Sequence, residues 1–470
     1  MPCEIPAVAV FVTDPLGNDV ELTNQRDSLY RITKREYHKN QTLIAGYSYG
    51  YDGMGNKEYQ EDLRVAADSE LYDYDDLDRL TEWERGELNA EKDDIVTTEA
   101  DQTWNLDPVG NWDETAFDGV TETRDHNYVN ELTHRENGLT ADLRYDDNGN
   151  LIEDDEYEYA YDAFNRLVEV TDKSNDKVIA EYTYDTQNRR TKKKTGSAGD
   201  SVGGSASVAY AYDGWQMVEE HEVRGGGGGN GQGKGKGEGQ SGPGGGSGGE
   251  TVRTYTYGSY IDEPITMTTS GAGRSGTFYY HTNNLYNVRA LTDERGRVVE
   301  RYKYSAYGEP KILDPDGTER GKSVVGNPYM FQGRRLDAET GLYYYRNRYY
   351  SAALGRFVTR DPMGYEDAYN LYLFVGNVPT TVTDPKGLKI DKIESCNKVW
   401  KNRLKRAAKT AEVAMNKMDS FFALPTLEAM ETLGECWNAE SDPCGKYQNF
   451  MNKMGGTWGR TGANLLLAGR

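Results

Sequence analysis

The stretch from Glu156 to Val170, EYEYAYDAFNRLVEV, indicates which fold this chain can adopt. Its first half alternates with a period of two, so that side chains of one kind fall on one face of an extended strand. The tyrosines on that face are Tyr157, Tyr159 and Tyr161, and the opposite face carries Glu156, Glu158 and Ala160. Asp162 and Asn165 then supply a turn, because Asx side chains bond back to the chain and Asn tolerates positive φ. The stretch predicts a β-hairpin with one tyrosine-lined face.

The same pattern recurs along most of the chain. Each copy has an aromatic-Asp or Asp-Pro start, two or three turn residues and then an Asn or Asp, at Asn18, Asn56, Asp78, Asn111, Asn150, Asn165 and Asn188. Asn130, within HNYVNEL, divides the interval between Asn111 and Asn150. Most steps are close to the length of two strands and two turns, roughly 20 residues. Because a single hairpin cannot bury its own face, the copies must stack continuously. We therefore expect a mainly β fold of stacked hairpins.

Composition and charge narrow the function classes. Of 470 residues 36 are Tyr and only 10 are Phe, and the hydrophobic fraction is 36%, which favours tyrosine-rich strands with polar faces over aliphatic helices. The net charge is −23, made up of −27 in residues 1–388 and +4 in residues 389–470. Phosphate contacts need Lys and Arg, so we expect no nucleic acid on the acidic body. The basic tail leaves that question open for the tail alone.

A glycine-rich stretch interrupts the pattern at residues 224–249. Its composition is typical of a flexible, disordered insert. It lies between two strand-like stretches, residues 209–223 and 251–265, so we expect it to join the strands of one hairpin. The alternative is that it marks a domain boundary.

The N-terminus lacks the basic start and long apolar run of a signal peptide, and no run of 18 apolar residues occurs. We expect no transmembrane segment, and either export by a non-standard route or a chain that is a fragment of a longer one. The cysteines are too few for a disulfide scaffold, and both a Cys436–Cys444 bridge and free thiols stay open. The other two are Cys3 and Cys396. No metal-ligand spacing or cofactor motif occurs, so we predict no metal and no cofactor.

From residue 271 the repeat becomes denser. Four stretches within residues 279–388 carry a specific pattern: YYHTNNLYNVRALTD, YSAYGE, GRRLDAETGLYYYRNRYYSAALGRFVTRDP and NLYLFVGNVPTTVTDPKGL. They strongly resemble the repeat-associated core domain of the RHS (YD-repeat) proteins. The Tyr-Asp copies extend a weaker resemblance over most of residues 14–388. On this reading residues 1–270 are YD repeats, 271–388 are the core domain and 389–470 are a variable tail.

The resemblance implies a hollow spiral β-shell, closed or partial, around a variable C-terminal segment. It also implies a core domain similar to an aspartyl protease that cuts its own chain once. Carried onto this sequence, Asp361 and Asp384 are the catalytic pair, Arg360 supports them, and the cut falls between Leu388 and Lys389. The tail is then the cargo of a secreted or cell-surface polymorphic toxin used in bacterial competition, with a secretion machinery and an immunity protein as partners. At most this is a single-turnover enzyme without an external substrate.

The chemistry is consistent with this interpretation, but Asp-Pro-x-Gly is also a good turn anywhere. Two carboxylates held close together share a proton, so that one acts as base on a water molecule and the other as acid on the leaving group. Asp14 and Asp107 begin the same motif in the repeats, where it is simply a turn. The alternative function is therefore a structural or adhesive surface repeat that never cuts itself.

Beyond Leu388 the strand pattern stops. Apolar residues of 397–424 step by three or four, which predicts an amphipathic helix with a basic opposite face, and residues 425–437 suggest a second helix. The tail contains no histidine, which excludes His-dependent nuclease and hydrolase mechanisms within it. We expect a small helical toxin or effector, with a remnant that only packs as the alternative.

Overall fold

The computed structural model describes residues 10–13, 18–137, 140–196, 207–223, 250–270, 275–365, 368–389 and 391–392. The glycine-rich insert, the predicted tail helices and the four cysteines lie outside these residues. Val10–Asn24 and Lys34–Asp391 form one compact unit. The other unit includes Gln25–Thr33, where the Arg31 guanidinium pairs with Asp27 at 2.6 Å.

The described chain is mainly β, as predicted. Two long sheets hold their strands in chain order, and neighbours such as β15 and β16 pair antiparallel. The first sheet comprises β1 (Val10–Thr13), β2 (Val20–Arg26), β3 (Ile32–Lys39), β4 (Thr42–Tyr51), β5 (Lys57–Asp62), β6 (Ser69–Tyr74), β7 (Leu80–Leu88), β8 (Ile95–Leu106), β9 (Trp112–Phe117), β10 (Val120–His126), β11 (Leu132–Glu136) and β12 (Thr140–Asp142). The second comprises β13 (Arg144–Tyr145), β14 (Leu151–Glu153), β15 (Tyr157–Tyr161), β16 (Leu167–Asp172), β17 (Lys177–Tyr184), β18 (Arg190–Thr195), β19 (Ser207–Asp213), β20 (Gln216–Val223), β21 (Glu250–Tyr257), β22 (Pro264–Thr269), β23 (Gly276–Thr282), β24 (Val288–Thr292), β25 (Val298–Tyr304), β26 (Pro310–Leu313) and β27 (Glu319–Arg320).

Smaller elements accompany the two long sheets in the described residues. A four-stranded sheet contains β28 (Arg335–Asp337), β29 (Leu342–Tyr344), β30 (Tyr349–Ser351) and β31 (Arg356–Phe357), and a two-stranded one contains β32 (Val382–Thr383) and β33 (Asp391–Lys392). Three short 3-10 helices are η1 (Ala66–Asp68), η2 (Phe331–Gly333) and η3 (Val375–Asn377). We call the strands and turns of the two long sheets the wall, and residues 329–388 the core segment.

The alternation of tyrosines decides which face of a strand is buried. In β15, Tyr159 is buried and Tyr157 and Tyr161 are half-buried, whereas Glu158 and Ala160 are exposed. The predicted tyrosine face is therefore the inner one. The strands that flank the glycine-rich insert, β20 and β21, pair with each other, so the predicted hairpin is confirmed there.

The turns of the repeat share one geometry, which we call the repeat turn. An aspartate Oδ1 accepts the N–H groups of the residues two and four positions later, and its Oδ2 accepts a side-chain N–H from the fifth residue of the turn. Among the described residues, the seven turns with all these bonds begin at Asp52, Asp75, Asp107, Asp146, Asp162, Asp185 and Asp293. The fifth residue is Asn or Arg in all seven. These carboxylates thus find their donors within the turn, which explains why Asp recurs there.

The fifth residue also links one turn to another further along the chain. Asn111 Nδ2 donates to Asp107 Oδ2 at 2.8 Å and to Asn130 Oδ1 at 2.9 Å, and Arg79 Nη1 donates to the Asp107 carbonyl at 2.6 Å. The Asn and Asp residues that mark the repeat in the sequence do not all occupy one position of this turn. Asn165 is itself the residue with positive φ (58°), whereas Asn111 follows Gly110, which has it (87°).

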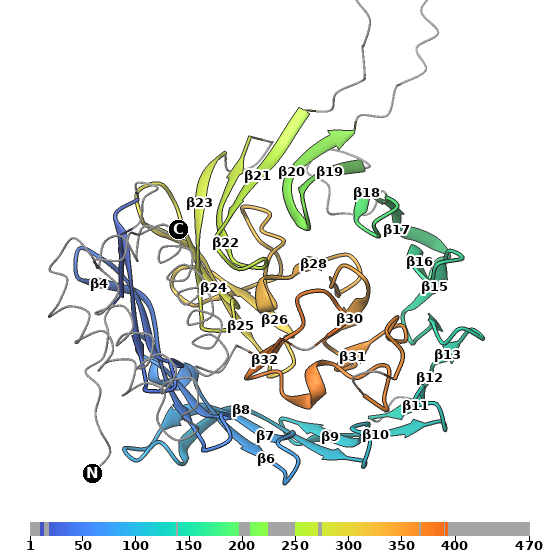
Figure 1. Ribbon diagram of the computed structural model, residues 1–470, viewed down its shortest axis with the longest axis horizontal. Coiled ribbons are helices and arrows are strands. Elements are labelled where there is room, and N and C mark those ends of the chain that lie inside the picture. The colour runs from blue at the N-terminus through green and yellow to red at the C-terminus, as the bar shows by residue number, and fades with distance from the viewer. Residues whose placement is uncertain are drawn as a thin grey trace, which may run out of the picture. The chain divides into compact units, whose positions relative to one another are not determined.

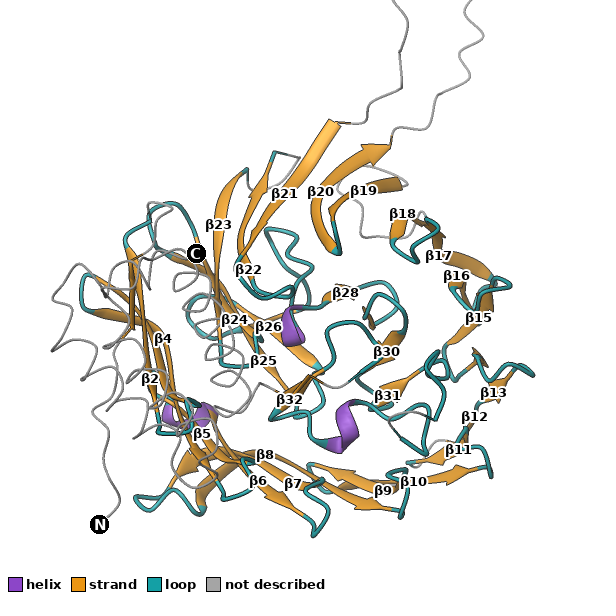
Figure 2. Cartoon of the chain, viewed as in Figure 1, coloured by secondary structure: helices purple, strands orange, loops and turns teal. Residues whose placement is uncertain are grey.

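The core segment packs against these turns from inside. Figure 1 shows the strands of this unit curving around β28, β30, β31 and β32, and Figure 2 shows that loops dominate the core segment. Asn377 Nδ2 donates to the Gly110 carbonyl at 2.8 Å, and the Tyr372 hydroxyl donates to the Gly149 carbonyl at 2.8 Å. Tyr343 and Tyr350 are completely buried. Two buried hydrophobic clusters join the wall to the core segment, one containing Tyr343 and Tyr350 and the other containing Tyr344 and Tyr349.

Candidate functional site

The two aspartates of the Asp-Pro-x-Gly pair meet at one arginine. Arg348 Nη2 lies 2.9 Å from Asp361 Oδ2 and 3.4 Å from Asp384 Oδ2. The Arg348 side chain is 3% exposed and its guanidinium stacks on the Phe357 ring at 3.6 Å. The residues predicted as a catalytic pair therefore come together in space, with a cation between their carboxylates.

Both aspartates begin modified repeat turns. Asp361 Oδ1 accepts the N–H of Met363, and Asp384 Oδ1 accepts the N–H of Lys386. The fourth residues, Gly364 and Gly387, have positive φ of 66° and 64°. The fifth residues are Tyr365 and Leu388, which have neither the amide nor the guanidinium found in the repeat turns. In place of a fifth residue of its own, each Oδ2 has Arg348, which both turns share.

The loop after Asp384 holds the predicted cleavage site against that carboxylate. Asp384 Oδ1 accepts N–H bonds from Lys386 at 3.2 Å, Leu388 at 3.1 Å and Lys389 at 3.2 Å. The Lys389 nitrogen belongs to the peptide bond between Leu388 and Lys389. A carboxylate thus touches the nitrogen that would leave if this bond were cut.

Three consecutive residues of the core segment hold three consecutive carbonyls of this loop. Arg346 Nη1 donates to the Pro385 carbonyl, Asn347 Nδ2 donates to that of Lys386 at 3.0 Å, and Arg348 Nε donates to that of Gly387 at 2.7 Å. We call Arg346, Asn347 and Arg348 the loop clamp. The clamp binds main-chain atoms, so it fixes the backbone whatever side chains the loop carries.

Arg360, predicted to support the aspartates, has its described contacts elsewhere. Its Nη2 pairs with Glu131 Oε1 at 2.6 Å and its Nε donates to the Tyr372 hydroxyl at 3.2 Å. It lies over the turn at Gly149, where an added Cβ would come within 2.1 Å of Arg360 Nε. It therefore ties the residue before Asp361 to the wall, while Arg348 stands between the aspartates.

Burial sets the electrostatics of the site. Burial raises the pKa of the Asp384 carboxyl above its ordinary value, and the nearby Arg348 and the backbone N–H bonds oppose that rise. Burial likewise lowers the pKa of the Arg348 guanidinium, and Asp361 and Asp384 oppose it. The arrangement has one carboxyl of raised pKa that accepts the N–H of Lys389, and a second carboxylate beside a cation.

Sequence reasoning missed Arg348 and the rest of the loop clamp. Arg348 is 36 residues from Asp384 in the sequence, and nothing local links them. One signal was present: the repeat turns end in Asn or Arg, and the turns at Asp361 and Asp384 do not. When the fifth turn residue offers no donor, a buried aspartate Oδ2 needs a donor from elsewhere in the chain. The lack of Asn or Arg at this position could therefore have directed a search for a distant arginine.

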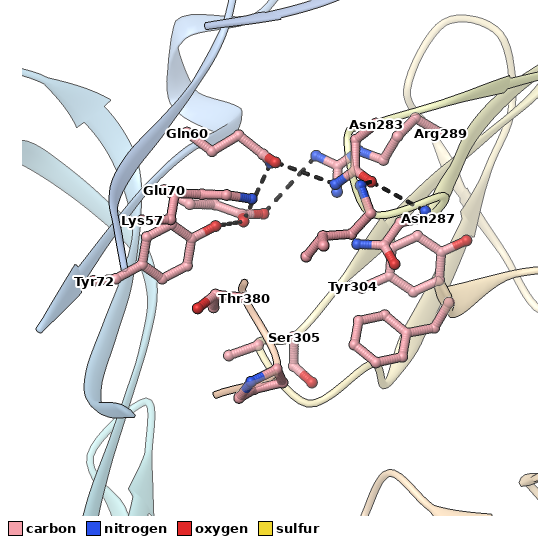
Figure 3. Close-up of a pocket in the computed structure, with 14 residues that line it drawn as sticks. Lys57, Gln60, Glu70, Tyr72, Asn283, Asn287, Arg289, Tyr304, Ser305 and Thr380 are labelled. Carbon is pink, nitrogen blue, oxygen red and sulfur yellow. Dashed lines mark hydrogen bonds and ion pairs between the residues drawn. The ribbon is translucent and has the colours of Figure 1, made fainter. Parts of the chain in front are cut away.

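A second buried polar cluster lies where β5 and β6 face the turn before β24. Figure 3 shows Lys57, Glu70 and Tyr72 on one side of this pocket and Asn287 and Arg289 on the other. Lys57 is 1% exposed, and burial lowers its pKa to about 7, assisted by Arg289 and opposed by Glu70. The free volume is about 20 Å³, room for a single water molecule, so it takes no organic ligand.

In the described part of the chain no group of three or more His, Cys, Asp or Glu side chains is arranged to hold a metal ion. No helix among the described residues is long and apolar enough to span a membrane.

Comparison with known proteins agrees with this architecture. The profile of the RHS Repeat family matches residues 161–201, which begin inside the Glu156–Val170 stretch. A "tRNA3(Ser)-specific nuclease WapA" of Bacillus spizizenii is 29% identical over 279 residues, and the "Toxin protein Tse5" of Pseudomonas aeruginosa is 36% identical over 118. The chain thus contains an RHS repeat at residues 161–201 and is similar to RHS-repeat and toxin proteins.

The RHS relatives are much longer than the part they share with this chain. The matches cover 58% of this chain and 10% of the WapA nuclease, and 25% of this chain and 8% of Tse5. The crystal structure of TcdB2-TccC3-TEV has a TM-score of 0.56 at 17% identity, covering 79% of this chain and 18% of that one. At that identity the similarity concerns the fold alone.

Proposed function

We propose that this RHS protein is a carrier that cuts its own chain between Leu388 and Lys389 and holds the segment beyond the cut as its cargo. The observation that supports this is the contact of Asp384 Oδ1 with the Lys389 amide nitrogen at 3.2 Å. Asp361 and Asp384 both pair with the same guanidinium nitrogen, Arg348 Nη2. Asp384 contacts this peptide bond directly, and Asp361 is linked to the same loop through Arg348, which also donates to the Gly387 carbonyl. Peptide hydrolysis needs a base for water and an acid for the leaving nitrogen, and we assign these roles to the two aspartates.

The proposed reaction uses the two carboxyls in opposite roles. Asp361, kept ionised by Arg348, takes one proton from a water molecule, whose oxygen adds to the Leu388 carbonyl carbon. The carbon–nitrogen bond then breaks as protonated Asp384 gives its proton to the Lys389 nitrogen. The products are a carboxylic acid at Leu388 and an amine at Lys389, with Asp361 protonated and Asp384 ionised. Because the substrate is tethered, a modest catalyst suffices for one turnover.

Arg348 changes the expected chemistry of the pair. Carboxylates in direct contact share one proton because they cannot both ionise. Here a cation lies between them, which favours the ionised form of the nearer one, at 2.9 Å. The two roles are then set by position: Asp384 is bound to the amide nitrogen, and Asp361 is held by the arginine. Arg360 is assigned a supporting role through its bond to Glu131.

The division of the chain follows from the cut. We propose residues 1–270 as YD repeats, 271–388 as the core domain and 389–470 as the toxin or effector tail. The charge of −27 before the cut and +4 after it favours retention of the tail by the shell, as a modest effect that salt screens. Delivery in bacterial competition, with a secretion machinery and an immunity protein as partners, belongs to the same proposal.

The test is the intact mass of the purified chain under denaturing conditions. The wild type should give two pieces, residues 1–388 and 389–470, and the Asp361→Asn and Asp384→Asn variants should each give one. The matched control is Asp107→Asn, which alters an Asp-Pro-x-Gly turn whose Oδ2 is bonded by its own Asn111. This control should be cut like the wild type. Four uncut chains would instead favour the structural or adhesive repeat.

A further inference from the structure

Each aspartate turn of the site is attached to the wall through an arginine. On the Asp384 side the wall residue is Asp262, in the turn between β21 and β22. Asp262 is 3% exposed, and its Oδ1 pairs with Arg334 Nη1 and with Arg346 Nη2, both at 2.7 Å. A buried wall carboxylate thus holds two buried arginines of the core segment.

The same two arginines hold the loop that carries the predicted cut. Both Arg334 Nη1, at 3.3 Å, and Arg346 Nη1 donate to the Pro385 carbonyl. Arg346 is also the first residue of the loop clamp, so its position is transmitted to Arg348 and then to both aspartates. Asp262 touches no atom of the loop in the contacts described, and it acts through these arginines alone.

On the Asp361 side the wall residue is Glu131, the last residue of the turn between β10 and β11. Glu131 pairs with Arg360 at 2.6 Å, and the next residue is Asp361. The Leu371 carbonyl accepts both the Asp361 N–H at 2.9 Å and Arg348 Nη1 at 3.2 Å. Two turns that lie far apart along the wall thus fix the two halves of one site.

We propose that closure of the wall around the core segment licenses self-cleavage, with Asp262 and Glu131 as positioning residues. This inference rests on the proposed function. Before the wall turns dock, Arg346 and Arg360 lack these carboxylate partners, and burying Arg346, which is 7% exposed, without a partner is unfavourable. The loop clamp and the aspartates then lack their relative positions. The cut therefore waits until the shell has formed, and the cargo is not released from an open chain.

The experiment is a pulse-chase of the full chain made by cell-free synthesis, in which the fraction cut is followed with time. Asp262→Asn keeps the shape of the side chain and removes its charge. Since a displacement of about 1 Å in a reacting geometry costs about 100-fold in rate, we expect cleavage to slow about 100-fold. Asp262→Glu, which restores the carboxylate, should recover most of the rate.

The matched control is Glu220→Gln. Glu220, in β20, is another buried wall carboxylate, and it pairs with Arg335 of the core segment, whose described contacts do not include the loop. Asp262→Asn loses its ion pairs with Arg334 and Arg346, and Glu220→Gln loses its ion pairs with Arg335 and Arg253. Each variant loses two ion pairs, so their thermal midpoints should fall alike. Only Asp262→Asn should slow the cut. If Asp262→Asn does not fold, Glu131→Gln tests the same attachment from the other side.

Two results would overturn the inference while leaving the proposed function intact. Either Asp262→Asn is cut as fast as the wild type, or Glu220→Gln is slowed just as much, which would mean that lost stability alone explains the effect. A wild-type chain that stays whole would overturn the inference and the proposed function together. If the wild type is cut and the Asp361→Asn or Asp384→Asn variant is cut as well, only the assigned chemistry is refuted.

Discussion

Replacing Gly387 by Ala should separate the geometry of the loop from its chemistry. Gly387 has φ of 64°, and an added Cβ would lie 2.5 Å from the Tyr345 carbonyl oxygen and 3.3 Å from the Arg348 nitrogen. A relaxed carbon–oxygen contact is about 3.3 Å, so the loop must move by roughly 0.8 Å. That movement carries the Leu388–Lys389 bond away from Asp384, and we expect cleavage to slow about 100-fold.

Gly364→Ala is the matched control for this prediction. Gly364 occupies the same place in the Asp361 turn with φ of 66°, but no atom lies within 4 Å of an added Cβ. Both variants incur the conformational cost of a non-glycine residue at positive φ, about 1 kcal/mol, and only Gly387→Ala adds the collision. The assay is the rate of cutting of freshly synthesised chain on a denaturing gel. Equal rates for the two variants, whether fast or slow, would refute the role given to loop position.

Two further predictions concern stability. The pKa of Lys57 is about 7 in the folded protein and 10.5 in the unfolded chain. Below pH 7 the buried, protonated Lys57 therefore destabilises the folded state, and this destabilisation disappears as the pH rises from about 7 to 10.5. Lys57→Met should therefore stabilise the protein relative to wild type by about 3 kcal/mol more at pH 6 than at pH 9 in urea unfolding, and an equal gain at both pH values would contradict this reasoning. Asn111→Ala removes the hydrogen bonds to Asp107, Asn130 and Asn370 and should lower the free energy of unfolding by about 2 kcal/mol. The control, Val109→Ala at the tip of the same turn, should lower it by less than about 0.5 kcal/mol. Equal losses would contradict the linking role of the fifth turn residue.

Short-range patterns gave reliable predictions of the elements. The alternation around Tyr159 predicted the buried face of β15, and the Asp of each repeat predicted a turn. Both depend on contacts within a few residues, which a sequence displays directly. The sequence did not predict which position of its turn each repeated Asn occupies, because Asn can either adopt positive φ or donate from its side chain. Asn165 adopts positive φ, and Asn111 donates from its side chain.

The sequence indicated the two aspartates of the candidate site but not the residues that surround them. The pairing of Asp361 with Asp384 came from a resemblance, and their relation to Arg348 depends on how distant loops pack. Arg360 illustrates the limit: its neighbour in the sequence is Asp361, yet its described partners are Glu131 and Tyr372. Adjacent residues in an extended chain point to opposite sides, so closeness in sequence does not imply contact.

By itself the sequence determined the hairpin array, the turns and the tyrosine-lined inner face, because these follow from the period of two and from the hydrogen bonds of Asx side chains. Only the tertiary structure decided which Asp-Pro-x-Gly turns differ from the rest. In the repeat turn at Asp107 the carboxylate is bonded by Asn111 of the same turn. At Asp361 and Asp384 the packing of the core segment supplies one shared, buried Arg348 instead, and the Lys389 amide nitrogen lies against the second of these carboxylates.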